Sequence, residues 1–226
     1  MVPHSDYPKY MAMLQTKPEF SKFTENEMQI FAQDVVFKKY AKGQALYDQG
    51  DKRDKFYFLI DGIVRTERFD EDGEFNYYEY VNKDHGFPYR GLFQDEEYSY
   101  TVRAMTKITI AVFSMSTIEI LLRQNNAMME LVIQEMGQII SQNEDQLQNM
   151  VTSSASDRVR HALSILGNQL GHDTDDGQRH IDYPLTLIEL AQVSATTRET
   201  ASSVVSGLID DHRISYVHKR ITFLNS

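Results

Sequence analysis

The last forty residues constrain the fold most, because two segments there carry the same helix-start signal only ten positions apart. Thr186 precedes Glu189 by three positions, and Thr196 precedes Glu199 by the same spacing. In such a capping box the threonine hydroxyl accepts a hydrogen bond from the third amide of the helix, and the glutamate accepts one from the cap amide. The spacing predicts two short helices joined by a tight turn over residues 193–195, which is a helix-turn-helix.

Apolar residues mark the inner side of both helices, and hydrogen-bonding residues mark the outer side of the second. The inner residues are Leu187, Leu190 and Ala191, then Val204, Val205, Leu208 and Ile209. The outer face of the second helix consists of Thr197, Arg198, Thr200, Ser202 and Ser203. Because such a helix can enter the DNA major groove, this face predicts contact with bases. The alternative is that it is only the solvated side of an amphipathic helix.

The end of the chain predicts a β-hairpin wing. Residues 214–217 and 221–224 alternate well enough for two short strands, and His218, Lys219 and Arg220 lie at the bend. Basic residues on such a turn can contact phosphate, which fixes register on DNA without reading sequence. Solvated loop charge is the alternative. We expect backbone or accessory DNA contacts from Thr196, Thr197, Thr200, Ser203, Lys219 and Arg220.

The composition excludes several classes of site. The chain has no cysteine, so it has no disulfide, thiolate zinc site, cysteine-ligated iron–sulfur cluster or cysteine nucleophile. Its 226 residues, 41% of them hydrophobic, suffice for two modest packed domains. No apolar run approaches the roughly 18 residues of a membrane span, and the N-terminus has no signal-peptide pattern. We therefore expect a cytoplasmic protein with no membrane partner.

The net charge of −10 argues against a tight, non-specific binder of nucleic acid. From residue 154 onward the chain carries 7 basic and 9 acidic side chains, so this end is less acidic than the rest. It still lacks the broad basic stripe of non-specific binders. We expect DNA binding that depends on few contacts and on dimerisation, and that weakens with salt.

Residues from about 20 to 115 predict an all-β block. Aromatic and β-branched residues alternate there with the turn signals Gly43, Gly50–Asp51, Asp61–Gly62 and Asp72–Gly73. The best strands are Phe56–Ile60, Ile63–Thr66, Phe75–Val81 and Ile108–Phe113. A roll of this kind can hold a small ligand or be filled with side chains. Before the strands, a third capping box from Thr24 to Glu27 predicts a helix ending near Asp34.

A long helix is predicted after the roll, with an apolar seam at alternating spacings of three and four. The seam consists of Met129, Ile133, Met136, Ile140, Asn143, Leu147 and Met150. Such a narrow stripe is typical of a parallel two-stranded coiled coil, so we expect it to join two chains. Val132 and Ile139 would pack against the roll; a helix packed wholly on its own domain is the alternative.

The region after the seam predicts a hinge, a helix and a loop. Residues 152–155 are a plausible hinge, and residues 156–170 form an amphipathic helix with Val159, Leu163 and Leu166 inward. Residues 171–177 are polar and acidic, so we expect a surface loop.

In this order the parts resemble the CRP/FNR superfamily of bacterial transcription factors, which includes the cyclic-AMP receptor protein and the fumarate-nitrate regulator. The motifs that carry the resemblance are Gly43, Gly50–Asp51, Phe58–Gly62, Gly91–Phe93, Val102–Ala104 and Arg198–Thr200. The resemblance implies an α+β fold in four parts. These are an N-terminal segment (1–19), a double-stranded β-helix or jelly-roll domain of the cyclic-nucleotide-binding type (20–118), a dimerisation helix (119–153) and a winged helix-turn-helix (154–226).

The nucleotide site that the resemblance implies is degenerate. Cyclic-AMP-responsive members bind ribose through a glutamate and the cyclic phosphate through an arginine–serine pair, and the matching positions here are Tyr89, Tyr98 and Ser99. A buried phosphodiester needs a charge-assisted partner, and Pro88 replaces a glycine and removes an amide donor. We expect cyclic AMP to bind weakly or not at all. Another effector could use Tyr89, Arg90, Tyr98, Ser99 and Asn143, with Arg103 nearby, or these residues are ordinary structural groups.

No cofactor or metal is expected. Other members of the superfamily sense oxygen through an iron–sulfur cluster, but this chain has no cysteine to bind one. Haem binding would rest on the lone His85, which is weak evidence.

The resemblance matches the DNA-contacting residues of the family more fully than it matches the nucleotide site. Arg198 and Glu199 match residues that read guanine and cytosine in the cyclic-AMP receptor branch, and Ser202 matches a base-reading serine of the fumarate-nitrate branch. Ser203 replaces a second reading arginine, so one operator position should be read loosely. Glu199 has two candidate roles, cap and reader. Ala195 stands where a turn glycine is usual, so we expect strain or an altered turn there.

We therefore expect a non-enzymatic, homodimeric transcription regulator that binds a two-fold symmetric DNA operator and contacts RNA polymerase, with or without a small-molecule effector. A cupin-like metal enzyme is one rival, but its histidines would have to cluster. Here they are scattered at His4, His85, His161, His172, His180, His212 and His218. The other rival, a ligand-binding regulatory module that acts on a partner protein, leaves the helix-turn-helix unexplained.

Overall fold

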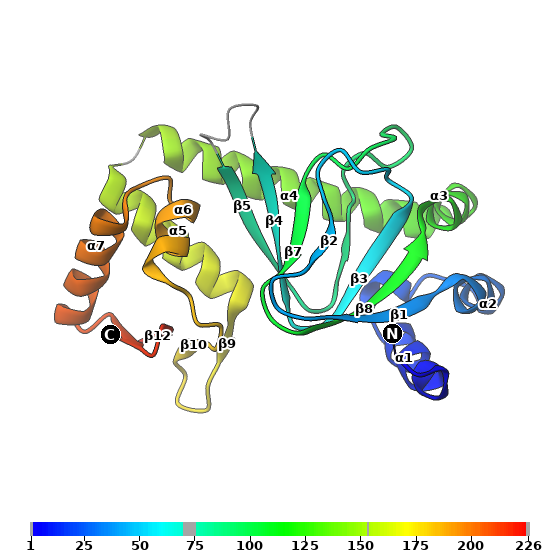
Figure 1. Ribbon diagram of the computed structural model, residues 1–226, viewed down its shortest axis with the longest axis horizontal. Coiled ribbons are helices and arrows are strands. Elements are labelled where there is room, and N and C mark those ends of the chain that lie inside the picture. The colour runs from blue at the N-terminus through cyan, green and yellow to red at the C-terminus, as the bar shows by residue number, and fades with distance from the viewer. Residues whose placement is uncertain (1, 70–75, 153, 225–226) are drawn as a thin grey trace. The chain divides into compact units, whose positions relative to one another are not determined.

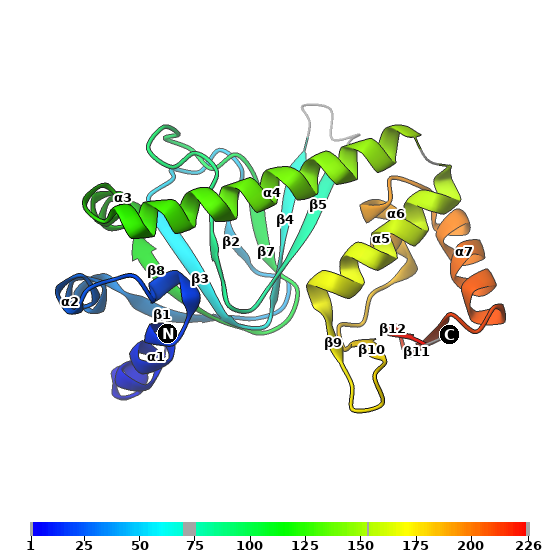
Figure 2. The same cartoon turned by 180° about the vertical axis from the view of Figure 1, so that it is seen from behind.

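The computed structural model describes residues 2–69, 76–152 and 154–224. The chain divides into two compact units, one formed by Met1–Arg68 with Val81–Ser141 and the other by Phe69–Tyr80 with Gln142–Ser226. Figures 1 and 2 show the elements of both units from opposite sides. Within the described ranges, no helix is long and apolar enough to cross a membrane.

The first unit is built on a roll of two antiparallel sheets, with strand orders β1-β8-β3-β6 and β2-β7-β4-β5 (Figure 1). The strands are β1 (Val36–Tyr40), β2 (Ala45–Tyr47), β3 (Lys55–Asp61), β4 (Ile63–Phe69), β5 (Asn76–Asn82), β6 (His85–Phe87), β7 (Thr101–Ala104) and β8 (Ile108–Ser114). Only Val81 and Asn82 of β5 belong to this unit. The four strands predicted from the sequence are confirmed as β3, β4, β5 and β8. The predicted turn at Asp72–Gly73 lies outside the described residues.

Strand β3 explains why its sequence is continuously apolar. Successive side chains of a strand point to opposite faces, and both faces of β3 are buried. Phe56 and Phe58 join a cluster with the surrounding helices, whereas Tyr57 and Leu59 join a second cluster that draws on both sheets. The interior of the roll is therefore packed with side chains, many of them aromatic.

The helices of the first unit pack on the outer side of the roll (Figure 2). They are η1 (His4–Asp6), α1 (Tyr7–Gln15), η2 (Pro18–Phe20), α2 (Glu25–Asp34), α3 (Met115–Gln124) and the first part of α4 (Asn126–Thr152). The predicted capping box at the start of α2 is confirmed. The Glu27 amide donates to Thr24 Oγ1 at 3.3 Å, and the Thr24 amide donates to Glu27 Oε2 at 2.8 Å.

Helix α1 was not predicted from the sequence. It packs on the core through Leu14, which is fully buried, and the Val2 amide donates to the Phe37 carbonyl of β1 at 3.1 Å. The Tyr7 hydroxyl also accepts from the Phe37 amide at 3.3 Å. The N-terminal segment is thus part of the packed unit.

Asn125 separates α3 from α4. Its Oδ1 accepts from the Met128 amide at 3.1 Å, and its Nδ2 donates to Glu27 Oε2 at 2.9 Å and to the Lys22 carbonyl at 3.0 Å. The same side chain therefore caps α4 and ties its start to α2. The predicted dimerisation segment, 119–153, begins within α3, and the four predicted domain limits stay a prediction.

The second unit combines three helices with a small sheet. The helices are α5 (Ala155–Leu170), α6 (Leu187–Val193) and α7 (Arg198–Asp210), and the sheet has the order β11 (Ile214–Val217), β12 (Arg220–Phe223), β10 (Arg179–Ile181) and β9 (Gly171–Asp173). The predicted helix over 156–170 is confirmed, and Val159, Leu163 and Leu166 are buried as expected. The predicted hinge at 152–155 includes Ser153, which lies outside the described residues.

The prediction of a surface loop over residues 171–177 was wrong in its first half. Residues 171–173 form β9, which pairs with β10, and β10 pairs in turn with β12. The Arg179 guanidinium on β10 binds the Asp173 carboxylate, with Nε 2.9 Å from Oδ1. These polar residues form a strand because a distant partner pairs with them, and local composition carries no sign of that partner.

Candidate nucleic-acid interface

Helix α6 begins where the sequence predicts. The Glu189 amide donates to Thr186 Oγ1 at 3.1 Å, and the Thr186 amide donates to Glu189 Oε2 at 2.8 Å, so this capping box is confirmed. The Tyr183 hydroxyl donates to the other oxygen of the same carboxylate. Leu190 and Ala191 are buried, while Leu187 is half-buried. The first helix of the motif is therefore fixed at its start and along its inner side.

The turn after α6 is left-handed at Ala195, whose φ is +46°. This confirms the expectation of strain at a position where glycine is usual. The Thr196 amide donates to the Ala191 carbonyl at 3.0 Å, and the buried Ser194 hydroxyl donates to the Leu190 carbonyl at 2.7 Å. These bonds add donors to the last carbonyls of α6 and fix the turn against the end of the helix.

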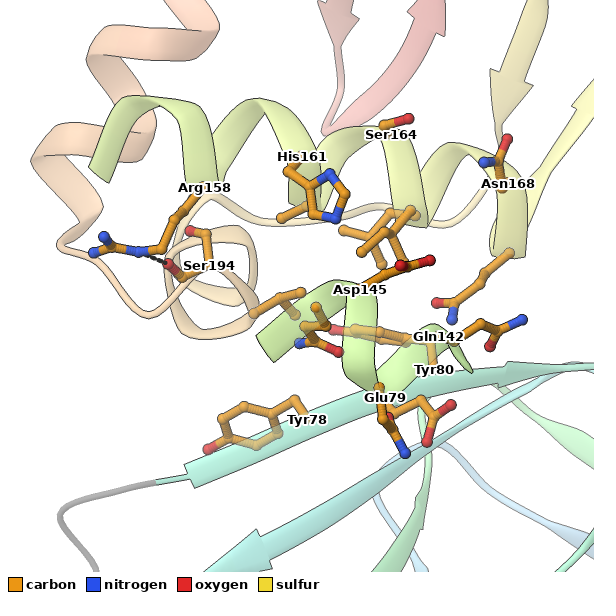
Figure 3. Close-up of a pocket in the computed structure, with 17 residues that line it drawn as sticks. Tyr78, Glu79, Tyr80, Gln142, Asp145, Arg158, His161, Ser164, Asn168 and Ser194 are labelled. Carbon is orange, nitrogen blue, oxygen red and sulfur yellow. Dashed lines mark hydrogen bonds between the residues drawn. The ribbon is translucent and has the colours of Figure 1, made fainter. Parts of the chain in front are cut away.

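Arg158 of α5 holds the same turn from outside. Its Nε donates to the Ser194 carbonyl at 3.1 Å, as Figure 3 shows, and its NH2 group donates to the Ala195 carbonyl at 3.0 Å. A guanidinium presents several donors in a fixed plane, so two adjacent carbonyls can be bound at once. Arg158 therefore positions the residues that lead into α7, a role that the sequence reasoning missed.

Helix α7 begins one residue later than predicted, so the second capping box was wrong. The N-cap is Thr197, whose Oγ1 accepts from the Thr200 amide at 3.2 Å. Thr196 instead belongs to the turn, where its amide donates to the Ala191 carbonyl. Threonine is a favourable N-cap residue, so the sequence alone does not distinguish two adjacent threonines. Glu199 is consequently not the capping glutamate of α7, which removes one of its two candidate roles.

The inner side of α7 differs from the prediction at one residue. Ala201, Val204 and Val205 are buried and Leu208 is half-buried, whereas Ile209 is 38% exposed. The predicted inner position of Ile209 was wrong because, at 3.6 residues per turn, Ala201 and Leu208 mark the centre of the buried stripe and Ile209 lies at its edge.

The outer side of α7 presents Arg198 and Glu199 at its first turn. Both side chains are exposed, and neither makes a hydrogen bond or ion pair within the described part of the chain. Ser203 is exposed and Ser202 is half-buried on the same helix. The Arg198 guanidinium can therefore donate hydrogen bonds to an external ligand, and the Glu199 carboxylate can accept them. Neither group first has to break a bond within the described part of the chain.

The hairpin after α7 confirms the two predicted wing strands, which are β11 and β12. His218 and Lys219 form its turn, with φ values of +51° and +65°, and both are exposed. Left-handed backbone at two consecutive non-glycine residues is the geometry of a mirror-image two-residue hairpin turn. Arg220 Nε donates to the Asp182 carbonyl at 3.1 Å, whereas Lys219 makes no ion pair with the described residues.

The seam of α4 is largely exposed. Ile133, Ile140 and Leu147 are 60%, 55% and 62% exposed, Asn143 is exposed, and Met129 and Met136 are half-buried against the first core. Val132 is buried and Ile139 packs on the same cluster, which confirms their predicted side of the helix. The side chain of Met150 lies outside the described residues. An apolar row is thus left uncovered along one side of α4.

The predicted effector residues do not converge on one site. Tyr89 belongs to the helix-side cluster, whereas Tyr98 belongs to the cluster inside the roll. The Tyr98 ring stacks on Tyr47 with centroids 3.7 Å apart, and its hydroxyl donates to the Lys55 carbonyl at 2.8 Å. Burial raises the pKa of the Tyr98 hydroxyl. Tyr98 is therefore a structural residue of the roll interior.

The remaining predicted effector residues are also dispersed. Arg90 is exposed and Ser99 is half-buried. Arg103 donates to the Gly43 carbonyl at 3.0 Å, and its Nε lies 3.6 Å from the buried carboxylate of Glu67. The Arg103 guanidinium is therefore already bound to other groups of the roll.

Asn143 lines a cavity of about 280 Å³ in the second unit (Figure 3). Residues of β5 form one side, including Tyr78 and Tyr80, and α5 forms the other, including Arg158 and His161. The walls combine polar side chains with a larger apolar surface, and one lining residue, Arg158, also holds the helix-turn-helix. Sequence reasoning missed this cavity because its walls come from segments about eighty residues apart.

No group of three or more His, Cys, Asp or Glu residues in the ranges given above could hold a metal ion. His85 is exposed, and its Nδ1 lies 3.0 Å from the Lys83 carbonyl.

Comparison with known proteins agrees with this architecture. A family model described as the cyclic nucleotide-binding domain matches residues 37–125. The HTH-type transcriptional regulator ArcR of Staphylococcus aureus is 26% identical over 197 residues, which cover 85% of this chain and 81% of that protein.

Two solved structures share the fold over nearly the whole chain. The c-di-GMP-responsive global regulator CLP from Xanthomonas campestris has a TM-score of 0.72 at 16% identity, over 90% of this chain and 100% of CLP. FixK2 from Bradyrhizobium japonicum has a TM-score of 0.73 at 16% identity, over 84% and 93% of the two chains.

The matched domain and the shared fold define a chain with a roll of the cyclic-nucleotide-binding type, and the relative that it resembles over most of its length is a transcriptional regulator. This is the fold that the sequence resemblance to the CRP/FNR superfamily implied. The fold class expected from the sequence is confirmed.

Proposed function

We propose that the chain is a homodimeric, sequence-specific DNA-binding regulator that reads a two-fold symmetric operator with α7. The observation that carries the proposal is the open pair Arg198 and Glu199 on the first turn of α7, presented by a turn that Arg158 and Ala195 hold in place. A side chain on a rigid helix reads a base edge more selectively than one on a mobile loop.

The chemistry of the two side chains suggests the bases they read. Arg198 can donate two hydrogen bonds to guanine O6 and N7, and Glu199 can accept one from the cytosine amine. Ser202 lies half-buried beside them and is a third reader in this proposal. Ser203 is too short to replace an arginine, so the half-site is read loosely at that base.

Phosphate contacts fix the register. Lys219 on the wing turn and the N-terminal end of α7, with Thr196, Thr197 and Thr200, face the DNA backbone in this proposal, and Arg220 contributes from β12. With so few basic groups, counterion release gives a modest salt dependence and weak non-specific binding.

Dimerisation uses the exposed seam of α4. Ile133, Ile140 and Leu147 recur every seven residues, and a second copy of the helix would bury them. Asn143 falls in the same row and would fix the register of the two helices. Two recognition helices related by a two-fold axis suit half-sites about one helical turn apart.

Cyclic AMP is not the effector in this proposal. Tyr98 fills the position of the phosphate-binding arginine, and Arg103 is bound to Glu67. A cyclic phosphate placed there would lose its water without gaining a cation. Titration calorimetry should give no micromolar affinity for cyclic AMP. The small-molecule effector, if one acts, binds elsewhere, and RNA polymerase is the protein partner.

The two rival functions predict different behaviour. A cupin-like enzyme should retain stoichiometric metal after purification, which metal analysis detects. A regulatory module that acts only on a partner protein should show no preference among DNA sequences.

The test of the proposal is selection from random duplex DNA with the purified full chain. We expect enrichment of a palindrome with a guanine in each half-site, and a complex that contains two chains. Arg198→Ala should remove the enrichment of that guanine, whereas Arg160→Ala, an exposed arginine on α5, should not. Enrichment of no sequence by the wild-type chain would refute the proposal.

A further inference from the structure

A second cavity lies in the first unit, where η2, α3 and α4 meet β3 and β6. Its volume is about 60 Å³. The space occupied by one buried water is roughly 10–15 Å³ on the same kind of measure, so this cavity holds more than a single water. Its walls are mainly aromatic and aliphatic, including Phe20, Phe56 and Phe58.

Three polar side chains enter this apolar site from different elements. They are Glu19 of η2, Tyr89 after β6 and Glu135 of α4. Tyr89 is only 8% exposed, and its hydroxyl has no hydrogen-bond partner in the described part of the chain. Glu135 likewise makes no hydrogen bond or ion pair with the residues described. The hydrogen bond of the Glu19 carboxylate is to its own backbone amide.

The charges around the cavity are unbalanced. Burial and the neighbouring Glu135 raise the pKa of Glu19, and the same carboxylates add to the burial that raises the pKa of Tyr89. The nearby cation Lys17 binds Asp84 at 2.8 Å, and the exposed His85, which does not line the cavity, lowers the pKa of Glu19 in part. The two carboxylates are half-buried, and no lysine, arginine or histidine lines the cavity, so the site itself lacks a positively charged donor.

We infer that this cavity binds the ammonium group of a small primary amine. A primary ammonium has three N–H donors, and the Glu19 carboxylate, the Glu135 carboxylate and the Tyr89 hydroxyl offer three acceptors. Aromatic faces attract cations and also cover an alkyl stem, so Phe20, Phe56 and Phe58 suit the rest of the ligand. The volume limits the enclosed part to the ammonium and a few carbons.

Gly86 explains how the cavity is kept open. A Cβ atom built on Gly86 would lie 2.9 Å from the Tyr89 hydroxyl oxygen and 2.8 Å from Phe56 Cζ. Any larger residue would therefore displace the two rings that border the site.

The position of Glu135 connects the site to α4. Ile133 and Met136 of the seam flank Glu135 in sequence, while Val132, one turn earlier, is buried in the roll-side cluster. A bound amine would therefore hold this turn of α4 through Glu135. Amine binding is measured on the protein without DNA, so this inference stands or falls separately from DNA recognition.

The experiment is titration calorimetry of the full chain with n-propylammonium and tetramethylammonium chlorides. We expect saturable binding of one n-propylammonium per chain, and at least tenfold weaker binding of tetramethylammonium, which has no N–H donor. Glu135→Gln should weaken n-propylammonium at least tenfold. Glu130→Gln, an exposed glutamate on the same helix, should leave it unchanged.

Two results would overturn the inference. One is the absence of saturable n-propylammonium binding by a chain whose thermal unfolding is cooperative. The other is equal binding by wild type and Glu135→Gln, with cooperative unfolding in both. Tyr89→Phe keeps the ring and removes the third acceptor, so it should weaken binding less than Glu135→Gln does; an unchanged affinity in both variants would place the amine elsewhere.

Discussion

Replacing Ala195 with glycine should stabilise the second unit. Ala195 has a φ of +46°, and the residue is exposed, so its methyl group adds little buried surface. Left-handed backbone costs an L-residue about 1–2 kcal/mol relative to glycine. Glycine also destabilises the folded state by roughly 0.5–1 kcal/mol, because it raises the conformational entropy of the unfolded chain. The net gain should be about 0.5–1 kcal/mol.

Calorimetric unfolding measures this gain directly. For a unit of this size about 1 kcal/mol corresponds to roughly 4 °C, so Ala195→Gly should raise the melting temperature of the second unit by about 2–4 °C. Ser206→Gly is the matched control, because Ser206 is exposed within α7 and glycine there should lower stability by about 0.5 kcal/mol. A lower melting temperature for Ala195→Gly would show that the turn does not hold a left-handed residue.

Three further changes test other parts of the account. Arg158→Met removes two charge-assisted bonds to the Ser194 and Ala195 carbonyls, so urea unfolding should show a loss of about 2 kcal/mol, and an unchanged value would dismiss Arg158 as a positioning residue. Ile140→Glu should shift sedimentation equilibrium toward monomer, with a dimer loss of about 3 kcal/mol or more, while the exposed Gln138→Glu should not. The raised pKa of Glu19 means that the folded chain binds this proton more tightly than the unfolded chain, so stability falls as pH rises through the folded-state pKa. Glu19→Gln should lack that fall in urea titrations carried from acidic to neutral pH; an identical pH profile would contradict the raised pKa of this carboxyl.

Sequence patterns predicted the elements whose signals are local. The capping boxes at Thr24 and Thr186 need only residues three positions apart, and both are present. The run Phe56–Ile60 predicts a strand from its own aromatic and aliphatic residues, and the structure has this strand as β3. The family motifs then supplied the order of the parts.

Where the prediction failed, the decisive interaction was distant or ambiguous. Thr196 and Thr197 are equally good caps in sequence, and the bond from the Thr196 amide to Ala191 decides between them. Strand β9 depends on pairing with β10, and α1 depends on packing against Phe37. Neither partner is visible in the local pattern.

The base-reading side chains of the candidate site were predicted from the sequence, but the residue that positions them was not. Arg198 was identified from the outer face of the second helix, Glu199 was identified as a reader from the family resemblance, and both are exposed. Arg158, which holds the turn, lies almost forty residues earlier, and no sequence spacing connects the two. The amine site is built from η2, β6 and α4, so only the folded chain brings its three polar groups together.

The most direct test of the central claim is the affinity of wild type and Arg198→Ala for the selected operator and for random duplex DNA. The account predicts a loss of about 1–3 kcal/mol on the operator, a relaxed preference at the guanine, and a much smaller loss on random DNA. An equal loss on both DNAs would contradict base reading by α7.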